Sequence, residues 1–242
     1  MSTANSFSLD LYKKYSFLKP IYLFYNIYIR NLKYYFNSSQ FGEEKKIINY
    51  FKENYKGRYV DVGCYHPTKV NNTFEMYKKG WEGINIDLNP LSIELFNFAR
   101  PRDINICSAV SKNNSIKNLY FHNDLSPLNT IDKNHINFLK KEFSINKLKL
   151  KKVKPKKITD ILKKHKYYNI DFLNIDIEGH ELEVLKTLDF KKFKIKIICV
   201  EILIYNKLSR SRKSELFKFL KKKGYMLKDQ NVVNYIFKKK IT

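Results

Sequence analysis

Hydrophobic and polar positions along the chain fall into short β-rich runs and longer stretches with helical spacing. The most informative run is residues 58–63, where β-branched and aromatic residues precede Gly63. This predicts a buried strand that turns sharply at its carboxyl end. A second run of the same kind covers residues 83–88 and carries Asp87 at its end. Because ligands of open α/β sheets bind at the carboxyl ends of strands, these two runs mark the expected site.

Further runs of the same two kinds continue the alternation to the end of the chain. The expected strand at residues 195–202 is almost continuously apolar, as a strand covered on both faces should be. Other strands are expected at 104–110, 118–122, 171–176, 225–229 and 232–237. Helices are expected at 38–55, 73–79, 90–99, 158–166, after 181 as far as 188, and at 211–223.

Residues 11–36 form a separate stretch dominated by Tyr, Phe, Leu and Ile. Pro20 stands where a helix can begin, and Arg30 and Lys33 interrupt the apolar run. Only nine residues lie between Pro20 and Arg30, whereas a helix needs about 20 to cross a bilayer, so a membrane span is not expected. Two interpretations stay open: a helix packed over the main domain, which we favour, and a helix lying in a membrane interface.

Length and composition predict one domain with an extension. A chain of 242 residues with 43% hydrophobic content can bury a sizeable core, so we divide it into an extension, residues 1–37, and a domain, residues 38–242. Its cysteines include no Cys-x-x-Cys pair, which disfavours a disulfide framework or structural zinc and indicates a reducing compartment. The opening residues do not resemble a secretory signal. We therefore expect a cytoplasmic location, with peripheral membrane contact through residues 11–36 as the alternative.

The net charge of +24 suits a polyanionic partner, because a basic face releases counterions when it neutralises phosphates. The lysines, however, are spread along most of the chain, without an RNA-binding motif, zinc-finger spacing or an arginine-rich helix. This favours a solvated surface over nucleic acid as a partner. One cluster stands apart, since seven lysines lie within residues 147–157. It predicts an exposed connection, with a landing site for an anionic substrate or membrane as the alternative.

The spacing of the first two strands indicates what they bind. Asp87 follows Gly63 by 24 positions, which suits an acid that reaches the ribose hydroxyls of a nucleoside held over the first turn. The three-glycine dinucleotide fingerprint is absent, because residues 64–67 are Cys, Tyr, His and Pro. A pyrophosphate would therefore have no close backbone to rest on. The residues favour a nucleoside cofactor without a pyrophosphate, namely S-adenosyl-L-methionine.

Four motifs follow one another over roughly residues 38 to 204. They are Ser39 to Glu43, Tyr59 to Pro67 with Asn72-Thr73, Gly80 to Asp87, and Asp171 to Glu181. Together they resemble the FkbM family of S-adenosylmethionine-dependent methyltransferases. The resemblance implies an α/β, Rossmann-like class I methyltransferase fold. This fold has a mostly parallel seven-stranded sheet with helices on both faces, and the last two strands form an antiparallel edge. The family also implies O-methylation of a hydroxyl on a sugar or another small metabolite.

The resemblance assigns roles to the strand ends. Asp61 and Gly63 would shape the methionine end of the pocket, Asp87 would hold the ribose, and Ser108-Ala109 would flank the adenine. Gln40 would lie beside the cofactor, although a helix cap is the ordinary alternative for its stretch. The predicted cofactor-binding residues are Gln40, Asp61, Gly63, Cys64, Tyr65, Asp87, Leu88, Asn89, Ser108 and Ala109.

Methyl transfer from a sulfonium requires that the acceptor oxygen be held near the methyl carbon and that its proton be removed. The predicted catalytic residues are Asp176, Glu178 and His180, with Glu181 and His66 as further candidates. The ordinary alternative for Glu178 and Glu181 is stabilisation of a helix dipole. For Asp176 it is a hydrogen bond to the loop after the first strand.

Two further features bear on the chemistry. Asp176, Glu178 and Glu201 could supply oxygen ligands to a divalent metal, but no compact ligand pair supports one and none is predicted. Residues 111–157 lack a clear period and are expected to carry acceptor specificity, with residues 126–130 on the acceptor side. The prediction is an O-methyltransferase for a small-molecule or glycan-linked acceptor. An RNA methyltransferase and a non-catalytic basic adaptor on a membrane or polyanion are the alternatives.

Overall fold

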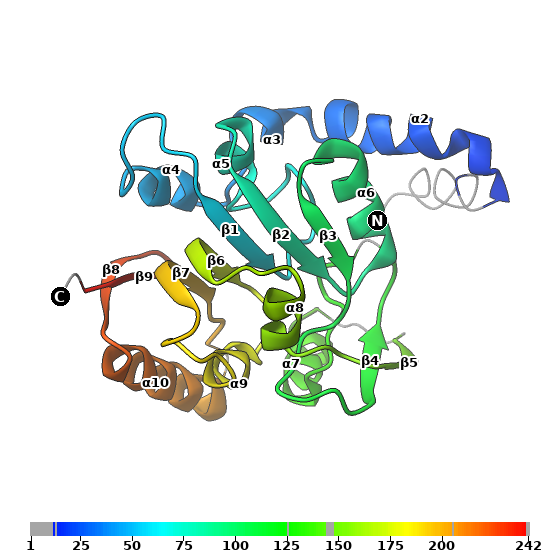
Figure 1. Cartoon of the computed structure of the whole chain (residues 1–242). Helices are drawn as coiled ribbons and strands as arrows, with labels where there is room; N and C mark the ends of the chain where they lie inside the picture. The colour runs from blue at the N-terminus through cyan, green and yellow to red at the C-terminus, as the bar shows by residue number, and fades with distance from the viewer. Residues whose placement is uncertain (1–11, 13, 125, 144–147, 205, 241–242) are drawn as a thin grey trace.

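The computed structural model describes residues 12, 14–124, 126–143, 148–204 and 206–240 (Figure 1). The expectation that the opening residues carry no secretory signal concerns positions outside these ranges. At the centre of the molecule is a seven-stranded sheet in the order β3-β2-β1-β6-β7-β9-β8. Its strands are β1 (Arg58–Val62), β2 (Glu82–Asp87), β3 (Ile104–Cys107), β6 (Asn169–Ile175), β7 (Lys194–Glu201), β8 (Tyr225–Gln230) and β9 (Asn234–Lys239).

The sheet is mostly parallel. β1 pairs in parallel with β2 on one side and with β6 on the other, and β3 and β7 extend the parallel set outward. β9 runs antiparallel to both of its neighbours, β7 and β8. Since β1 leads away toward β2 while its other neighbour is β6, the strand order reverses at β1. A reversal of this kind opens a crevice at the carboxyl ends of the strands.

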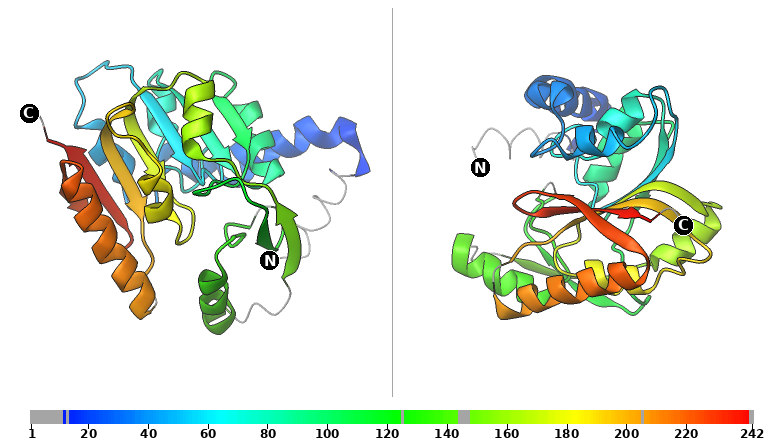
Figure 2. Two further views of the ribbon diagram at one scale, coloured as in Figure 1. Left: turned by 60° about the horizontal axis from the view of Figure 1, so that its bottom comes forward. Right: turned by 90° about the vertical axis from the view of Figure 1, so that its left-hand side faces the viewer.

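Helices cover both faces of the sheet (Figure 2), which explains why its central strands are apolar on both sides. One core joins the sheet to α8 (Ile158–Lys164), α9 (Glu181–Lys186) and α10 (Lys207–Lys222). On the other face, α4 (Glu43–Ile48) and α5 (Phe74–Lys78) contribute Ile47 and Met76 to a second core around Tyr59, Trp81 and Phe172. α6 (Pro90–Ala99) packs against β2 and β3.

The amino-terminal stretch is helical and packs on the domain. It comprises η1 (Ser16–Leu18), α2 (Lys19–Phe24), the π-helical η2 (Tyr25–Arg30) and α3 (Leu32–Phe36). Its buried side chains, Tyr22, Leu23 and Ile27, pack against Leu91 and Leu95 of α6. The favoured interpretation, a helix packed over the domain, is thus what the structure shows. Within the described ranges, no helix is both long and apolar enough to cross a membrane.

The helix expected over residues 38–55 is much shorter than predicted. α4 begins after Gly42, whose φ of +81° marks the boundary, and ends at Ile48. The chain then turns so that Phe51 and Tyr55 contact the ring of Trp81 at centroid distances of 4.8 and 5.6 Å. These tertiary aromatic contacts replace the remaining helical turns, because burial against Trp81 outweighs local helix propensity.

Residues 111–157 contain more regular structure than their sequence indicates. The lysine cluster, predicted to be an exposed connection, forms β5 (Lys149–Val153), which pairs antiparallel with β4 (Lys117–Phe121) in a separate two-stranded sheet. Its side chains are exposed except for the half-buried Val153, so backbone pairing and not apolar alternation defines this strand. The same segment forms α7 (Lys133–Phe143), which was not predicted. Asp132 accepts a hydrogen bond from the backbone amide of Asn134 and so caps this largely polar helix.

Candidate active site

A cavity of about 320 Å³ opens where the carboxyl ends of β1, β2, β6 and β7 meet. All ten predicted cofactor-binding residues line it, although they come from four separate stretches of the chain. Two of the three predicted catalytic residues, Asp176 and Glu178, also line it, whereas His180 does not. Pro127, Asn129 and Thr130 of the expected acceptor-side stretch also line it, and lining residues that the sequence did not single out include Lys69, Val70 and Asn234.

Gly63 allows the two central strand ends to approach each other. Its φ is +82°, and its backbone N–H donates to the carbonyl oxygen of Ile86 at 2.8 Å. A Cβ atom at this position would lie 1.7 Å from the backbone oxygen of Asp176. Only glycine satisfies both conditions, because it has no side chain and adopts positive φ at little cost. The floor of the cavity therefore depends on this one residue.

Asp61 of β1 holds the loop that follows this strand through hydrogen bonds to its carboxylate. Its buried carboxylate accepts hydrogen bonds from Asn71 Nδ2 (3.2 Å), Thr73 Oγ1 (2.9 Å) and Asn174 Nδ2 (2.9 Å). Burial raises the pKa of Asp61, while these donors and the nearby guanidinium of Arg100 oppose that rise. The fully buried Arg100 also donates to Thr73 and Asn71, so it closes the network.

Three residues around the cavity hold a backbone conformation that side chains rarely adopt. Tyr65, Val70 and Glu178 have φ angles of 53°, 47° and 55°, and all three line the cavity. The conformation is most unfavourable for Val70, because its side chain is β-branched. Strain of this kind persists only where the surrounding structure enforces it, and it concentrates at binding sites.

Asp87 is fixed at the end of β2 by two backbone donors. Its carboxylate accepts from the amide of Tyr65 at 2.9 Å and from the amide of Asn89 at 2.7 Å. Burial raises the pKa of Asp87 to about 6, and these two amides counteract part of that rise. The Asn89 side chain accepts from Asn129, which joins the end of β2 to the segment between β4 and α7. Asp87 therefore presents an oriented carboxylate to the cavity.

A group of acids gathers at the ends of β6 and β7. Asp176 and Glu201 line the same cavity and interact electrostatically. Burial raises the pKa of Asp176 well above its usual value, and the charges of Glu201 and Glu178 raise it further. Burial likewise raises the pKa of Glu201. Two interacting, half-buried carboxylates of raised pKa cannot both ionise cheaply, so the pair is suited to accept and release a proton.

Glu178 has a partner that the sequence did not reveal. Its Oε2 lies 3.2 Å from Nδ1 of His135, a buried residue of α7. Burial lowers the pKa of His135 to about 4, so the imidazole is neutral at pH 7 and can donate Nδ1–H to the carboxylate. Burial also raises the pKa of Glu178, with the charge of Glu201 as the next contribution. His135 lies in the segment without a clear period, where no local pattern marks it.

The other side chains predicted as proton acceptors, His180, His66 and Glu181, contact neighbouring protein groups. His180 lies between Glu183, at 3.6 Å from Nδ1, and Asp132, at 4.0 Å from Nε2, outside the cavity lining. His66 Nδ1 accepts from the backbone amides of Thr68 and Lys69, so it organises the loop after β1. Glu181 accepts from the amides of Ile177 and Gly179. These contacts hold the turn that leads into α9 (Glu181–Lys186).

The described part of the chain holds no group of three or more His, Cys, Asp or Glu side chains arranged to bind a metal ion. Asp176, Glu178 and Glu201 do converge at one end of the cavity, as the sequence suggested.

The strand order, the antiparallel β9 and the cavity at the carboxyl strand ends define a class I methyltransferase fold, as the sequence predicted. The sequence model of the methyltransferase FkbM domain matches residues 61–227, more than half of the chain. The protein belongs to this family and is, by membership, a methyltransferase. The predicted family and fold class are thereby confirmed.

Solved structures with a related fold include three methyltransferase chains. The methyltransferase FkbM of Methylobacillus flagellatus is 12% identical over 85% of this chain, with a TM-score of 0.48; the match spans half of that protein's length. A TehB-like SAM-dependent methyltransferase of Corynebacterium glutamicum is 10% identical over 98% of this chain and 100% of its own, with a TM-score of 0.42. The N-terminal domain of human METTL16, in complex with SAH, is 14% identical over 80% of this chain and 65% of its own, with a TM-score of 0.36. No protein of curated function matches the sequence.

Proposed function

We propose that the protein transfers the methyl group of S-adenosyl-L-methionine to a hydroxyl of a small-molecule or glycan-linked acceptor. The observation that supports this most is that one cavity carries acidic side chains at two places with different surroundings. It holds an oriented carboxylate, Asp87, at the end of β2 and an interacting acid pair of raised pKa, Asp176 and Glu201, at the ends of β6 and β7. The first suits a ribose, and the second suits an acceptor that must lose a proton.

The chemistry of the lining residues fits this cofactor. S-adenosylmethionine supplies an electrophilic methyl group on a positively charged sulfur. Asp87 would accept the ribose hydroxyls, and Leu88 and Ala109 would offer apolar surface to the adenine. Asp61 and Gly63 would shape the methionine end, and Lys69, a cation of the lining, would face the methionine carboxylate. An acidic cavity in a chain of net charge +24 is itself selective for a cationic ligand.

Removal of the acceptor proton is assigned to the acid group. Glu178 and the Asp176–Glu201 pair line the cavity, and their raised pKa values bring proton exchange closer to neutral pH. His135 would orient the Glu178 carboxylate through its Nδ1 atom. His180, which the sequence placed in the same role, lies outside the cavity lining in this arrangement and receives no catalytic role here.

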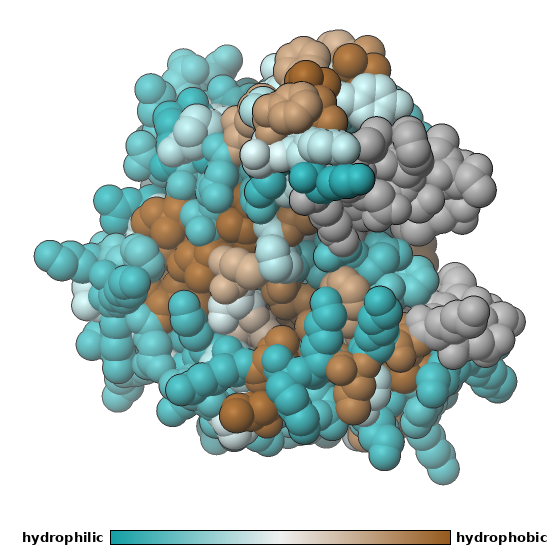
Figure 3. Space-filling view, turned by 90° about the vertical axis from the view of Figure 1, so that its right-hand side faces the viewer, coloured by the Kyte–Doolittle hydropathy of each residue, from teal (hydrophilic) through white to brown (hydrophobic). Residues whose placement is uncertain are grey.

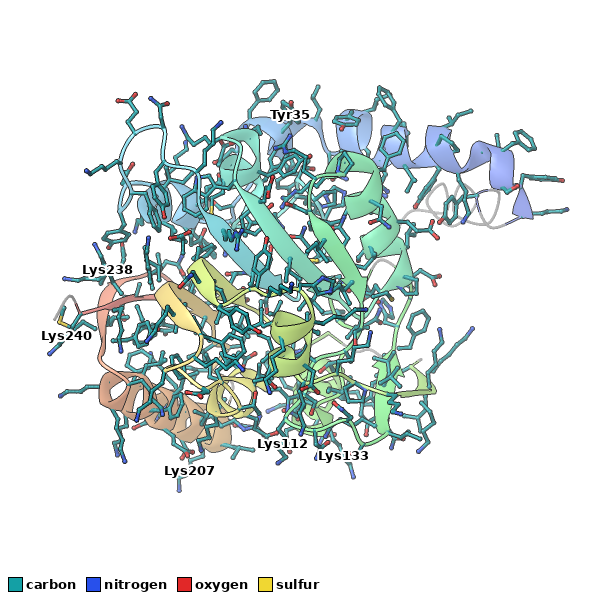
Figure 4. The ribbon with its side chains drawn as sticks, in the orientation of Figure 1. Tyr35, Lys112, Lys133, Lys207, Lys238 and Lys240 are labelled. Atoms are coloured by element: carbon teal, nitrogen blue, oxygen red, sulfur yellow. The ribbon has the colours of Figure 1, made fainter. Side chains whose placement is uncertain are left out.

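The charge distribution favours a small acceptor over RNA. Figure 4 shows Lys238 and Lys240 at the left of the molecule and Lys207, Lys112 and Lys133 along its lower edge, and the other lysines are spread along most of the chain. Scattered cations keep a protein in solution but do not form a continuous track for a phosphate backbone. An RNA acceptor would instead require tight binding with steep salt dependence. The three free cysteines, Cys64, Cys107 and Cys199, are consistent with a cytoplasmic location, which we propose.

Cofactor binding depends on Asp87 if the proposal is correct. Calorimetric titration with S-adenosylhomocysteine is expected to show one site, and Asp87→Ala is expected to weaken binding at least about tenfold, since it removes charge-assisted hydrogen bonds. Asp160→Ala is the control, because it removes the same charge from an exposed position in α8. A flat titration with folded wild-type protein defeats both the proposed enzyme and its cofactor, and favours the adaptor alternative.

The same titration is expected to depend on pH. The ribose hydroxyls need an ionised acceptor, and the pKa of Asp87 lies near 6, so protons compete with the ligand below that pH. Affinity should be nearly constant above pH 7 and fall by up to about tenfold for each pH unit below 6. In Asp87→Asn, the dependence should become shallower while binding stays weak. An affinity that rises on acidification contradicts the assigned role.

The acceptor class can be identified by incubating the protein with radiolabelled methyl donor and fractionated cell extract. Label is expected in the saccharide or small-metabolite fraction, and Asp87→Ala should abolish its transfer. Label that enters RNA and disappears on ribonuclease treatment would replace the proposed acceptor with the RNA alternative.

A further inference from the structure

The amino-terminal helices carry a second apolar face besides the one that packs on α6. Its side chains recur at intervals of three or four residues from η1 to α3, so they share one side of the helical rod. We call this set the outer apolar face. Its members, with their exposed fractions, are Phe17 (72%), Ile21 (65%), Phe24 (50%), Tyr25 (47%), Ile29 (57%), Leu32 (52%) and Phe36 (74%).

This concentration is not a general property of the surface. Of the nineteen large hydrophobic side chains that are exposed in the described part of the chain, eight lie between residues 15 and 36. Figure 3 shows apolar side chains gathered at the top of the side of the molecule that carries α2. Exposed single apolar residues need no explanation, whereas a contiguous face of this kind indicates a binding surface.

The charged side chains in the segment that carries the outer apolar face are all cationic, which favours an anionic partner. Residues 11–36 contain five lysines and arginines and no aspartate or glutamate. Lys14, Arg30 and Lys33 are exposed, and Lys33 Nζ lies 4.9 Å from the ring of Tyr34. Aromatic and aliphatic side chains flanked by cations on exposed long stems match the boundary between acyl chains and anionic headgroups.

A second copy of the chain is a poorer partner for the same face. A symmetric dimer would bring each face against itself, so its cations would meet cations with no acid of the face to pair them. We propose that the outer apolar face binds an anionic lipid surface, with the helices lying in the plane of the interface. None of the described helices is long and apolar enough to span a bilayer, so the proposed contact is peripheral.

Docking through this face would also hold the cavity rim near the lipid. His66, in the loop that lines the cavity, has Nε2 3.2 Å from Oδ1 of Asn26 in η2. Lys69, a cavity-lining residue of the same loop, has Nζ 5.8 Å from the ring of Tyr34 in α3. The lipid contact itself is argued from the outer apolar face alone, so it does not depend on the proposed enzymatic function.

The test is co-sedimentation of the full chain with vesicles of phosphatidylcholine, with and without phosphatidylglycerol. Binding to the mixed vesicles is expected to be at least about tenfold tighter than to the neutral ones. The double variant Phe17→Ser, Ile21→Ser should lose at least about tenfold in binding to the mixed vesicles. The matched control is Ile116→Ser, Val232→Ser, which removes side chains of similar exposure, 68% and 75%, from other parts of the chain and should bind as the wild type does.

Three outcomes overturn the proposal: no preference for anionic vesicles, an equal loss in both double variants, or a lipid-free dimer that Phe17→Ser, Ile21→Ser converts to a monomer. The last would assign the face to a second copy. Melting temperatures of both double variants establish that they fold, since all four side chains are exposed. Arg30→Gln with Lys33→Gln supports the proposal if it weakens binding to anionic vesicles only.

Discussion

Gly63→Ala is expected to lower the free energy of unfolding by more than about 4 kcal/mol. The new Cβ would lie 1.7 Å from the backbone oxygen of Asp176, so β1 and β6 must separate where they form the cavity floor. Flexible side chains cannot relieve the clash, because both of the nearest atoms belong to the backbone of Asp176. Chemical denaturation monitored by circular dichroism measures the loss.

Gly42→Ala provides a control that isolates the clash. Gly42 has a φ of +81°, nearly the same as Gly63, but a Cβ atom added at Gly42 would have no neighbouring atom within 4 Å. Its substitution carries only the cost of a left-handed backbone, about 1 to 2 kcal/mol. If the two variants lose equal stability, the close approach of β1 and β6 is not the reason that position 63 is glycine.

Asp176→Asn is expected to reduce methyl transfer by about 10²- to 10⁴-fold, once an acceptor fraction is known, because general-base removal of a proton is lost. Binding of S-adenosylhomocysteine should change much less, since Asp87 and the end of β2 are untouched. Initial rates with radiolabelled donor, compared with calorimetric affinities, separate these two effects. Glu215→Gln, an exposed acid of α10, is the control and should leave both unchanged.

The same variant should be at least as stable as the wild type at pH 7. The pKa of Asp176 is raised in the folded protein, so ionisation above its unfolded pKa costs stability as pH rises. Asparagine keeps the shape of the side chain without that charge, and it relieves repulsion from Glu201 and Glu178. A lower melting temperature together with unchanged activity would assign Asp176 a structural role instead.

Most strands and most helices could be predicted from local pattern because their signals are local, whereas β5 could not. β2 was expected at 83–88 and observed at Glu82–Asp87, and α6 was predicted with its observed limits, since Pro90 opens it. Alternation, apolar runs and glycine stops each act within a few residues. Patterns failed where contacts distant in sequence dominate, as at Tyr55, which packs against Trp81 instead of extending α4.

Only some of the residues in and around the cavity could be predicted from the sequence. Residues that end or follow strands, such as Gly63, Asp87 and Ser108, could be assigned to one rim, because parallel strands bring their carboxyl ends together. Arg100 and His135 could not be found, since each acts through a partner far away in the chain. His180 was expected beside Asp176 because they are close in sequence, but the turn at Gly179 directs them to different surroundings.

The sequence by itself determined that this protein is a class I methyltransferase of the FkbM family, since strand ends in a fixed order carry both fold and cofactor chemistry. Tertiary structure decided which acids interact and which histidine contacts Glu178, because burial and distance set pKa values and neither is a local property. It also decided that one side of the amino-terminal helices is buried on α6 while the other stays exposed. Both sides are rich in the same aromatic and aliphatic residues, so composition alone does not distinguish them.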